Sequence, residues 1–411
     1  MSTAFVKIAY FNLWQRKSRT VLVIVMIAFG LGAMIFSQGL YDGMIVQMKS
    51  DQIRTGGGEI TITKDGYQKS KLLADYIKDV PAVEAVLKGR EDIQDVTARL
   101  RCEGIVSSAK YAQGAVIIGV DVDREARFIN YKKPVVRGRF ALSPDENTVI
   151  IGQGLAEKLK VDLKKKIVIQ GQALNKEIVS MASRVAGIIK TNNPDIDNAG
   201  VLIAQTQLQK MFQVEGVTEF NILLKKESLL SAVKKEIIAA LEHKSQEKLE
   251  VFTWKELLPF LLMWEEVLVY FIYISYAIVF LVVALGIFFI IFISIFERIK
   301  EFGILTAMGT SFSSIVQIIF FEALIMGGLG YMCGAVSGFL LLILFKQSGV
   351  NLSYFSAGLK DIGMAAVMYP DVRFEYFVLG FIAMVISSFA AVIIPAWKLK
   401  RLKAVEAIRF V

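Results

Sequence analysis

Residues on which most enzyme active sites depend are scarce in this sequence. Its 411 residues include one histidine, His243, and two cysteines, Cys102 and Cys333. Zinc sites and metalloprotease sites need several such ligands close together, and His243 lies in the polar stretch ALEHKSQEKLE without a second His or Cys nearby. Cys102 lies in a polar region and Cys333 in an apolar run. We therefore expect no disulfide between them, and the polar region must be stabilised by its own core.

Motifs for nucleotide binding and for nucleophilic catalysis are also missing. GIIKT at 187–191 lacks the glycine directly before the lysine, and the sequence lacks the glycine five positions before that, which a phosphate-binding loop requires. GAVSG at 334–338 lacks the spacing of a nucleophile elbow and lies in an apolar run. RTGGGE at 54–59 is interpreted as a hinge rather than as a phosphate loop. We therefore expect this chain to catalyse no reaction and to bind no cofactor itself.

Long apolar runs are abundant instead. The mean hydropathy is +0.52 and 55% of the residues are hydrophobic, more than an ordinary soluble protein contains. A helix needs about 20 residues to cross the hydrocarbon core of a bilayer, and four runs are long enough: 20–43, 267–296, 315–345 and 376–395. The chain between and beyond these predicted spans is divided into 1–19, 44–266, 297–314, 346–375 and 396–411. The sequence thus predicts a membrane protein with four transmembrane helices and one large domain outside the membrane.

The first apolar run has two interpretations. Basic residues precede it, as they precede the apolar core of a cleaved signal peptide. However, the run is longer than such a core and ends in Ser37, Gln38 and Gly39 without a cleavage site of the A-x-A type. We interpret it as a retained membrane span.

The net charge of +9 is concentrated at the two ends of the chain. Lys7, Arg16, Lys17 and Arg19 precede the first span, and the segment 396–411 is strongly basic, whereas acidic and basic residues nearly balance in 44–266. Cytoplasmic flanks of membrane proteins carry such an excess of Lys and Arg. We therefore expect both termini and 297–314 in the cytoplasm, 44–266 and 346–375 on the other side, and no binding of nucleic acid.

The region 44–266 alternates strand-like and helix-like patterns. Short runs rich in Val and Ile predict strands at 58–63, 97–108, 114–121, 147–155, 165–172, 183–191 and 217–225. Apolar residues at three-to-four spacing predict helices at 71–80, 155–161 and 228–241. This arrangement favours a compact α/β domain, for which division into two lobes is one option because its β-rich centre is flanked by more helical ends.

Two of the predicted spans extend beyond the membrane. FTWKELLPFLLMW has no glycine, and Pro259 suits the first turn of a helix. A helix from about 258 to 302 would be roughly 65 Å long, about twice the thickness of the hydrocarbon core. The first span has apolar residues at helical spacing as far as Arg54. Two stiff helices of this kind would transmit motion, while AFVKIAYFNLWQRKSR at 4–19 predicts a helix at the membrane surface.

The third predicted span has a stripe of glycines and one acidic residue. Gly330, Gly334 and Gly338 recur every four residues, a spacing that lets another helix backbone approach closely. Dimerisation and packing within the bundle both fit this stripe better than a pore does. Glu322 lies about eight residues into the same span, where an acidic group is a candidate functional residue. It is interpreted as a carboxylate bonded to Ser or Thr hydroxyls of a neighbouring helix, with ion or proton coupling as the alternative.

The segment 297–314 is more patterned than a simple connection between two spans requires. Glu297 and Glu301 are expected on one helical face, flanked by Arg298 and Lys300. An apolar knob should follow them between two glycines, with exposed side chains at Phe302, Ile304, Leu305 and Met308. From the residues alone, docking into the groove of a partner and a simple return turn both remain open.

Four segments in order along the chain resemble motifs of ABC transporter permeases of the FtsX/MacB/LolC type. They are NLWQRKSRT before the first span, GRFALSPDENTVIIGQGLAEKLKVDLKKKIVI in the large domain, ERIKEFGILTAMG after the second span, and IPAWKLKRLKAVEAIR at the C-terminus. The third segment resembles the pattern E-R-x-x-E-x-G-x-L-x-A-x-G. Lys400 and Ala404 depart from the family's terminal pattern, which often has alanine and proline there, and a nucleotide-binding domain like that of MacB is absent from the sequence.

The resemblance implies a fold and an assembly. It implies a large periplasmic α/β domain of the MacB core type between the first two spans, two permease subunits, identical or paralogous, and two copies of a separate ATPase chain that binds ATP and Mg²⁺. The segment 297–314 would be the cytoplasmic coupling helix that contacts this ATPase, through Glu297, Arg298, Glu301, Phe302, Gly303, Leu305, Ala307, Met308 and Gly309.

Within the family, the chain is most similar to lipoprotein-releasing permeases of the LolC/LolE type in the bacterial inner membrane. The resemblance therefore implies extraction of lipid-anchored proteins for transfer to a periplasmic carrier. Two alternatives within the family are efflux through an adaptor protein, as in MacB systems, and FtsX-like force transmission without transport. A third interpretation, from another class, is a membrane receptor or scaffold that works without an ATPase.

Overall fold

The computed structural model describes residues 2–400 except 16, 130–134, 144–145, 353 and 355–364. The chain divides into two compact units. One, termed the α/β domain, comprises 46–263 and 352–366, and the rest of the chain is termed the helical bundle. Most of the predicted basic tail and part of the predicted loop 346–375 lie outside the described residues.

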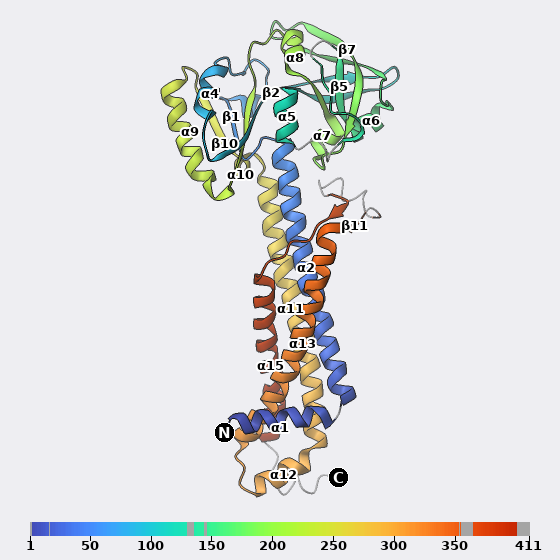
Figure 1. Cartoon of the computed structure of the whole chain (residues 1–411), viewed down its shortest axis with the longest axis vertical. Coiled ribbons are helices and arrows are strands. Elements are labelled where there is room, and N and C mark those ends of the chain that lie inside the picture. The colour runs from blue at the N-terminus through green and yellow to red at the C-terminus, as the bar shows by residue number, and fades with distance from the viewer. Residues whose placement is uncertain are drawn as a thin grey trace. The chain divides into compact units, whose positions relative to one another are not determined.

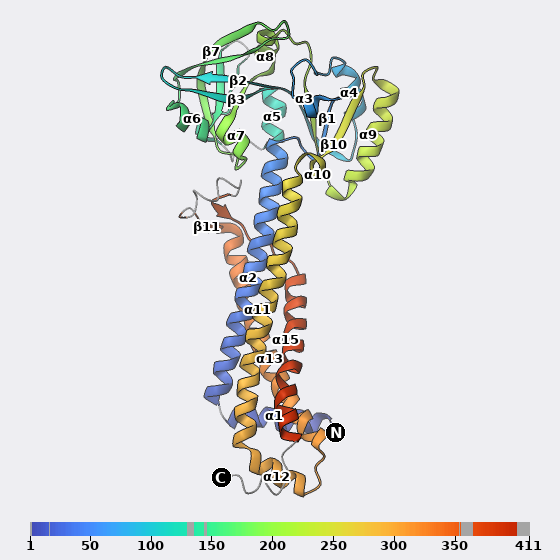
Figure 2. The ribbon, with the colours of Figure 1, turned by 180° about the vertical axis from the view of Figure 1, so that it is seen from behind.

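The helical bundle is formed by long apolar helices and two short ones (Figures 1 and 2). The long helices are α2 (Lys17–Thr55), α11 (Pro259–Glu297), α13 (Phe312–Ser348) and α15 (Glu375–Lys400). Within the described residues, these four are long and apolar enough to cross a membrane. The short helices are α1 (Ser2–Gln15), which lies across one end of the bundle, and α12 (Ile299–Ala307), at the same end. Buried side chains from all four long helices form the core, among them Ile27, Ile287, Ile319 and Met384.

The two helices expected to be unusually long end close to their predicted positions. Helix α2 continues to Thr55, one residue beyond the expected limit, and α11 begins at Pro259, as expected. The prediction that one helix runs on to Phe302 is wrong. Arg298 adopts a non-helical conformation (φ −111°, ψ 14°), so that α11 ends at Glu297 and α12 begins at Ile299.

The glycine stripe of α13 lies against α2 of the same chain. A Cβ atom at Gly334 would lie 2.8 Å from the carbonyl oxygen of Ala28, and one at Gly338 would lie 3.1 Å from that of Gly32. A Cβ atom at Gly330 would lie 2.6 Å from Cγ2 of Ile27. Real Cβ atoms rarely or never approach other heavy atoms so closely. Of the two interpretations left open by the sequence, the structure therefore assigns the stripe to packing within the bundle.

Two further glycines bring α2 against the segment that precedes α15. The backbone amide of Asp371 donates a hydrogen bond to the carbonyl oxygen of Gly39 at 2.8 Å, and a Cβ atom at Gly43 would collide with the carbonyl oxygen of Tyr369. Between these glycines, the carboxylate of Asp42 accepts a hydrogen bond from the hydroxyl of Tyr376. These contacts explain the spacing of the two glycines without a second chain.

The α/β domain is built on one ten-stranded sheet. Its strands are β1 (Ile60–Lys64), β2 (Ile93–Ser107), β3 (Ala112–Val120), β4 (Val135–Gly138), β5 (Thr148–Gly152), β6 (Lys166–Gln172), β7 (Ile178–Ile189), β8 (Gly200–Ala204), β9 (Glu219–Leu224) and β10 (Leu249–Thr253). The order is β10-β1-β9-β2-β3-β8-β5-β7-β4, with β6 paired to β2 and β7. The pairs β3–β8 and β5–β7 are parallel and the others are antiparallel.

Helices pack around this sheet in two groups (Figures 1 and 2). Helices α4 (Val80–Leu87) and α9 (Leu230–Lys244) lie near β1 and β10. Helices α6 (Gln153–Leu159), α7 (Pro194–Ala199) and α8 (Gln205–Phe212) lie near β5 and β7, and α5 (Val122–Phe128) contacts β2. The remaining short elements of this domain are α3 (Tyr67–Ser70), η1 (Glu227–Leu229) and α10 (Trp254–Leu257), whereas β11 (Val350–Asn351) and β12 (Val367–Met368) pair with each other in the helical bundle. The two groups correspond to the two lobes suggested by the sequence, although a single sheet runs through both.

All seven predicted strands are present, because their Val and Ile side chains fill the core on the faces of the sheet. The helix predicted at 71–80 is wrong. Lys71 has a positive φ of 52°, and Ile77 forms a bridge with Val217 instead. The side chain of Asp79 then caps α4 and Pro81 occupies its first turn, so the helix begins where the predicted one was to end.

Candidate functional site

Helix α12 is attached to the bundle by one face and is exposed on the other. Ile299 and Phe302 are buried, and Phe302 belongs to the bundle core. Ile304 is 51% exposed and Met308 is 70% exposed. Gly309 ends the connection with a positive φ of 91°, a conformation that glycine adopts without a steric penalty.

The predicted exposed knob is therefore partly wrong. Phe302 and Gly303 are buried and Leu305 is partly buried, so they hold α12 in place. The outward face is formed by Lys300, Glu301, Ile304, Thr306, Ala307, Met308 and Gly309. The expectation that Glu297 and Glu301 share one helical face is also wrong, because the break at Arg298 separates them into two helices.

A network of polar side chains surrounds this break. The guanidinium of Arg298 donates to Oε1 of Glu322 at 3.0 Å and to Oε2 of Glu301 at 2.8 Å. The side-chain amide of Asn12 in α1 donates to the same oxygen of Glu322 at 2.7 Å. Arg298 also lies over the ring of Phe302, 5.1 Å from its centroid. The network joins α1, α12 and α13.

Glu322 is 5% exposed, and its partners differ from the prediction. We expected Ser or Thr hydroxyls of a neighbouring helix, whereas the described contacts come from Asn12 and Arg298. The contact of Asn12 is not among those that the sequence predicts. The signal that could have identified it was already visible, because Asn12 opens the segment NLWQRKSRT that resembles a family motif.

A second charged contact joins the ends of α2 and α11. Nη1 of Arg19 donates to both carboxylate oxygens of Glu297, at 2.8 and 2.9 Å. The side chains are 50% and 32% exposed, so solvent screens the pair and its contribution to stability is small. The pair connects the last residue of α11 with the first turn of α2, and so restrains the positions of these two helix ends relative to each other.

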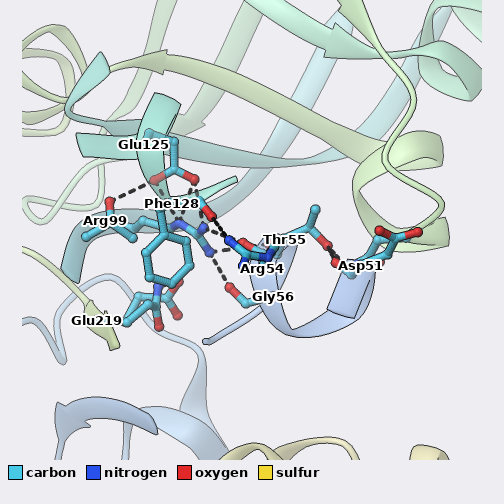
Figure 3. A network of polar contacts seen from close by, with 11 residues as sticks. Asp51, Arg54, Thr55, Gly56, Arg99, Glu125, Phe128 and Glu219 are labelled. Carbon is cyan, nitrogen blue, oxygen red and sulfur yellow. Dashed lines mark hydrogen bonds and ion pairs between the residues drawn. The ribbon is translucent and has the colours of Figure 1, made fainter. Parts of the chain in front are cut away.

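In the α/β domain, a different arginine closes the end of α2 (Figure 3). The guanidinium of Arg99 donates to the carbonyl oxygens of Arg54 and Thr55, the last two residues of the helix, and to that of Gly56, which follows it. It also pairs with Glu125 of α5 at 2.7 Å. Both charged residues are 1% exposed. These groups satisfy helix carbonyls that otherwise have no partner, and a cation is favourable at this end of the helix dipole.

The hinge at 54–59 stays a prediction, and its first three residues form a clamped helix terminus. Thr97 donates a further hydrogen bond to Glu125, at 2.8 Å, and Nη1 of Arg54 donates to the carbonyl oxygen of Phe128 at 3.0 Å. A buried ion pair is maintained when its remaining lone pairs and protons are satisfied in this way. The terminus of α2 is thus held by two elements of the α/β domain, β2 and α5.

The α/β domain also contains a cavity of about 300 Å³ beside this terminus. Its charged lining residues are of both signs: Lys71, Arg101, Glu103, Asp195 and Glu219. Burial lowers the pKa of the Lys71 ammonium from its usual value. Because the basic and acidic side chains of the lining nearly balance, the charge of this cavity does not indicate whether it would bind an anion or a cation. Among the described residues, no group of three or more His, Cys, Asp or Glu could hold a metal ion.

Four membrane-length helices, with a large mixed α/β domain inserted between the first and the second, define a multi-pass membrane protein with a periplasmic-type domain. The family model described as "MacB-like periplasmic core domain" matches residues 20–240, and that described as "FtsX-like permease C-terminal" matches residues 273–404. The chain belongs to the FtsX/MacB/LolC family of ABC transporter permeases.

Two curated relatives extend over most of the chain. The ABC transporter permease MJ1507 of Methanocaldococcus jannaschii is 25% identical over 355 residues, which are 84% of this chain and 85% of the relative. The lipoprotein-releasing system transmembrane protein LolC of Xylella fastidiosa is 20% identical over 290 residues, 66% of each chain.

Two solved structures cover about half of the chain. The periplasmic region of MacB from Actinobacillus actinomycetemcomitans gives a TM-score of 0.35 at 13% identity, covering 48% of this chain and 89% of that chain. The extracellular domain of the transporter YknZ from Gram-positive bacteria gives a TM-score of 0.33 at 16% identity, covering 47% of this chain and 99% of that chain.

Proposed function

We propose that this chain is a non-catalytic permease subunit whose helix α12 receives a separate ATPase chain. The observation that carries the proposal is the two-sided geometry of α12. Phe302 fixes one face in the bundle core, while Ile304 and Met308 are held exposed on the other. A short helix with a fixed base, whose outer face exposes apolar side chains beside charged ones, suits insertion into a groove of a partner protein.

The assembly that fits this proposal contains two ATPase chains, which bind ATP and Mg²⁺, and two permeases, identical or paralogous. Both termini and α12 would then lie in the cytoplasm, and the α/β domain in the periplasm. Movement driven by ATP would reach the α/β domain through α2 and α11, whose continuous helices of 39 residues exceed the roughly 20 residues that a bilayer requires.

For the cargo, we propose lipid-anchored proteins that are extracted from the inner membrane and passed to a periplasmic carrier. The similarity to LolC of Xylella fastidiosa, a protein of a lipoprotein-releasing system, supports this choice. Efflux through an adaptor is a second candidate, because a MacB-like core domain matches 20–240. FtsX-like force transmission without transport is a third outcome of the test below.

Reconstitution tests the proposal directly. The full chain, purified with its ATPase and placed in liposomes that contain an acylated protein, should release that protein when ATP is added. Release at the same rate without ATP would exclude ATP-driven extraction. ATP hydrolysis without release of the acylated protein would favour efflux or force transmission.

Docking is tested separately by a charge on the outer face of α12. Met308→Asp should abolish co-purification of the ATPase, because a carboxylate cannot enter an apolar groove without a large desolvation cost. The matched control is Ser313→Asp, which adds the same charge at an exposed position of α13. Undiminished co-purification of Met308→Asp would exclude α12 as the docking element.

A further inference from the structure

We infer that Arg298, Glu322 and Asn12 form a latch that fixes the orientation of α12 on the bundle and makes α1, α12 and α13 move together. The inference rests on the proposed function, in that α12 is the element on which the ATPase acts. The three are positioning residues: none belongs to the outward face of α12, and their effect on coupling is exerted through the helices they join.

The break between α11 and α12 creates the need for such a latch. Arg298 alone separates the two helices, and its φ and ψ are not helical. One non-helical residue is enough to let a short helix change direction relative to a long one. The orientation of α12 therefore depends on contacts made by the break itself, and not only on the continuity of the chain.

Arg298 supplies contacts on both sides of the break. Within α12, its Nε donates to Glu301 at 2.8 Å and its guanidinium lies over Phe302. Across to α13, its Nη1 donates to Glu322 at 3.0 Å. The fork of an arginine can hold two partners at fixed angles, which a single ammonium group cannot do equally well. Its planar guanidinium therefore sets the angle between α12 and α13.

Of the two carboxylates that Arg298 contacts, Glu322 contributes more to holding α12 in place, because it is buried. The side chain of Glu322 is 6% exposed and that of Arg298 is 14% exposed, whereas Glu301 is 61% exposed and screened by solvent. Separating a buried pair leaves a charge without a partner, which is strongly unfavourable. The Arg298–Glu322 contact should therefore persist while the bundle moves.

Asn12 extends the latch to the N-terminal helix. Its side-chain amide donates to the same carboxylate oxygen at 2.7 Å, so that Glu322 accepts from α1 and from the α11–α12 break at once. A displacement of α12 then reaches α13 and α1 together. The separate pair Arg19–Glu297 connects α2 with α11 at this end of the bundle.

The test compares Glu322→Gln with the wild-type complex in liposomes. Glutamine keeps the shape of the side chain but removes the charge, and the outer face of α12 is unaltered. We expect ATPase co-purification at the wild-type level and about tenfold less acylated protein released for each ATP hydrolysed. Glu322→Asp, which restores the charge, should recover part of the loss.

The matched control is Asp42→Asn, which removes a carboxylate that faces Arg373 and Tyr376 elsewhere in the same bundle. It should leave the ratio of release to hydrolysis unchanged. A wild-type ratio in Glu322→Gln, or an equal loss in Asp42→Asn, would overturn the latch.

A distance measurement separates this inference from the proposed function. Spin labels on Tyr10→Cys and Met308→Cys, in a Cys333→Ala background, report the distance between α1 and α12 in the full chain without the ATPase. The two labelled side chains are 48% and 70% exposed. We expect a narrow distribution, broadened at least twofold by Glu322→Gln. An unchanged width would overturn the latch even if the ATPase docks, whereas absence of docking with the expected broadening would overturn only the proposed function.

Discussion

Two arginines act at points where a long helix stops. Arg99 donates to the last carbonyls of α2 in the α/β domain, and Arg298 occupies the break that ends α11 in the bundle. Each also pairs with a buried glutamate, Glu125 or Glu322. An arginine can satisfy a carboxylate and other acceptors at the same time. In both places a helix terminus becomes a defined junction between elements.

Removal of Arg99 tests this role in the α/β domain. Arg99→Met should lower the local stability around 54–59 by about 3–5 kcal/mol, because Glu125 is left buried without a counter-charge. The double variant Arg99→Met with Glu125→Leu should recover much of that loss. Hydrogen exchange of the amides at 54–59 in the full chain measures both. Exchange at the wild-type rate in Arg99→Met would contradict the clamp.

The thiol of Cys102 should be unreactive in the folded protein. Burial, with a smaller effect of Glu103, raises the pKa of this thiol to about 12. The folded state therefore favours the neutral thiol, and the resulting stabilisation, present below the ordinary thiol pKa, is lost as the pH rises towards about 12. A maleimide at pH 8 should label Cys102 at least 100-fold faster in denaturant than in the native protein. Similar rates in the two conditions would contradict the burial.

Among the elements, α2 and α13 approach each other closely at three glycines of α13. Gly334→Val should destabilise the bundle by about 1–3 kcal/mol, because its side chain would be forced against the backbone at Ala28. The matched control is Gly328→Val in the same helix, where an added Cβ atom meets nothing within 4 Å. Thermal unfolding of the detergent-solubilised protein compares the two variants. An equal effect of both would contradict a specific contact at Gly334.

Elements with a strong local pattern were predictable, and those that depend on distant partners were not. The apolar spans and the seven Val- and Ile-rich strands follow from periodicity and length alone. Strand β4 has only four residues, whereas β8 and β10 were missed although each is as long as the predicted strands β1 and β5. The helix expected at 71–80 gave way to the bridge between Ile77 and Val217, a contact across 140 positions of sequence.

In the candidate site, too, the local pattern was predictable and the contacts between distant residues were not. The motif that begins at Glu297 identified the segment, but the burial of Phe302 and the break at Arg298 depend on how α12 packs on the bundle core. The Asn12–Glu322 contact joins residues 310 positions apart. The periodicity of helices and strands predicts contacts only between residues close in sequence. The contact between Asn12 and Glu322 is therefore visible only in the folded structure.

At the scale of the whole molecule, the proposed topology predicts which residues each side of the membrane can reach. In membranes that lack the ATPase, a membrane-impermeant maleimide should label Met308→Cys only from the cytoplasm, and Ile178→Cys, in the α/β domain, only from the periplasm. Both side chains are well exposed, at 70% and 80%. Labelling of both positions from the same side would contradict an odd number of crossings between them.

The glycine stripe of α13 has a consequence for the proposed pairing of two permeases. In the proposed pair of permeases, α2 of the same chain already occupies the backbone at Gly330, Gly334 and Gly338, so that a neighbouring subunit would meet other surfaces of the bundle, formed largely by apolar side chains. Interfaces of that kind accommodate exchanges of one aliphatic or aromatic group for another more readily than a backbone seam does. A gene duplicate could therefore diverge in sequence and still take the place of an identical neighbour.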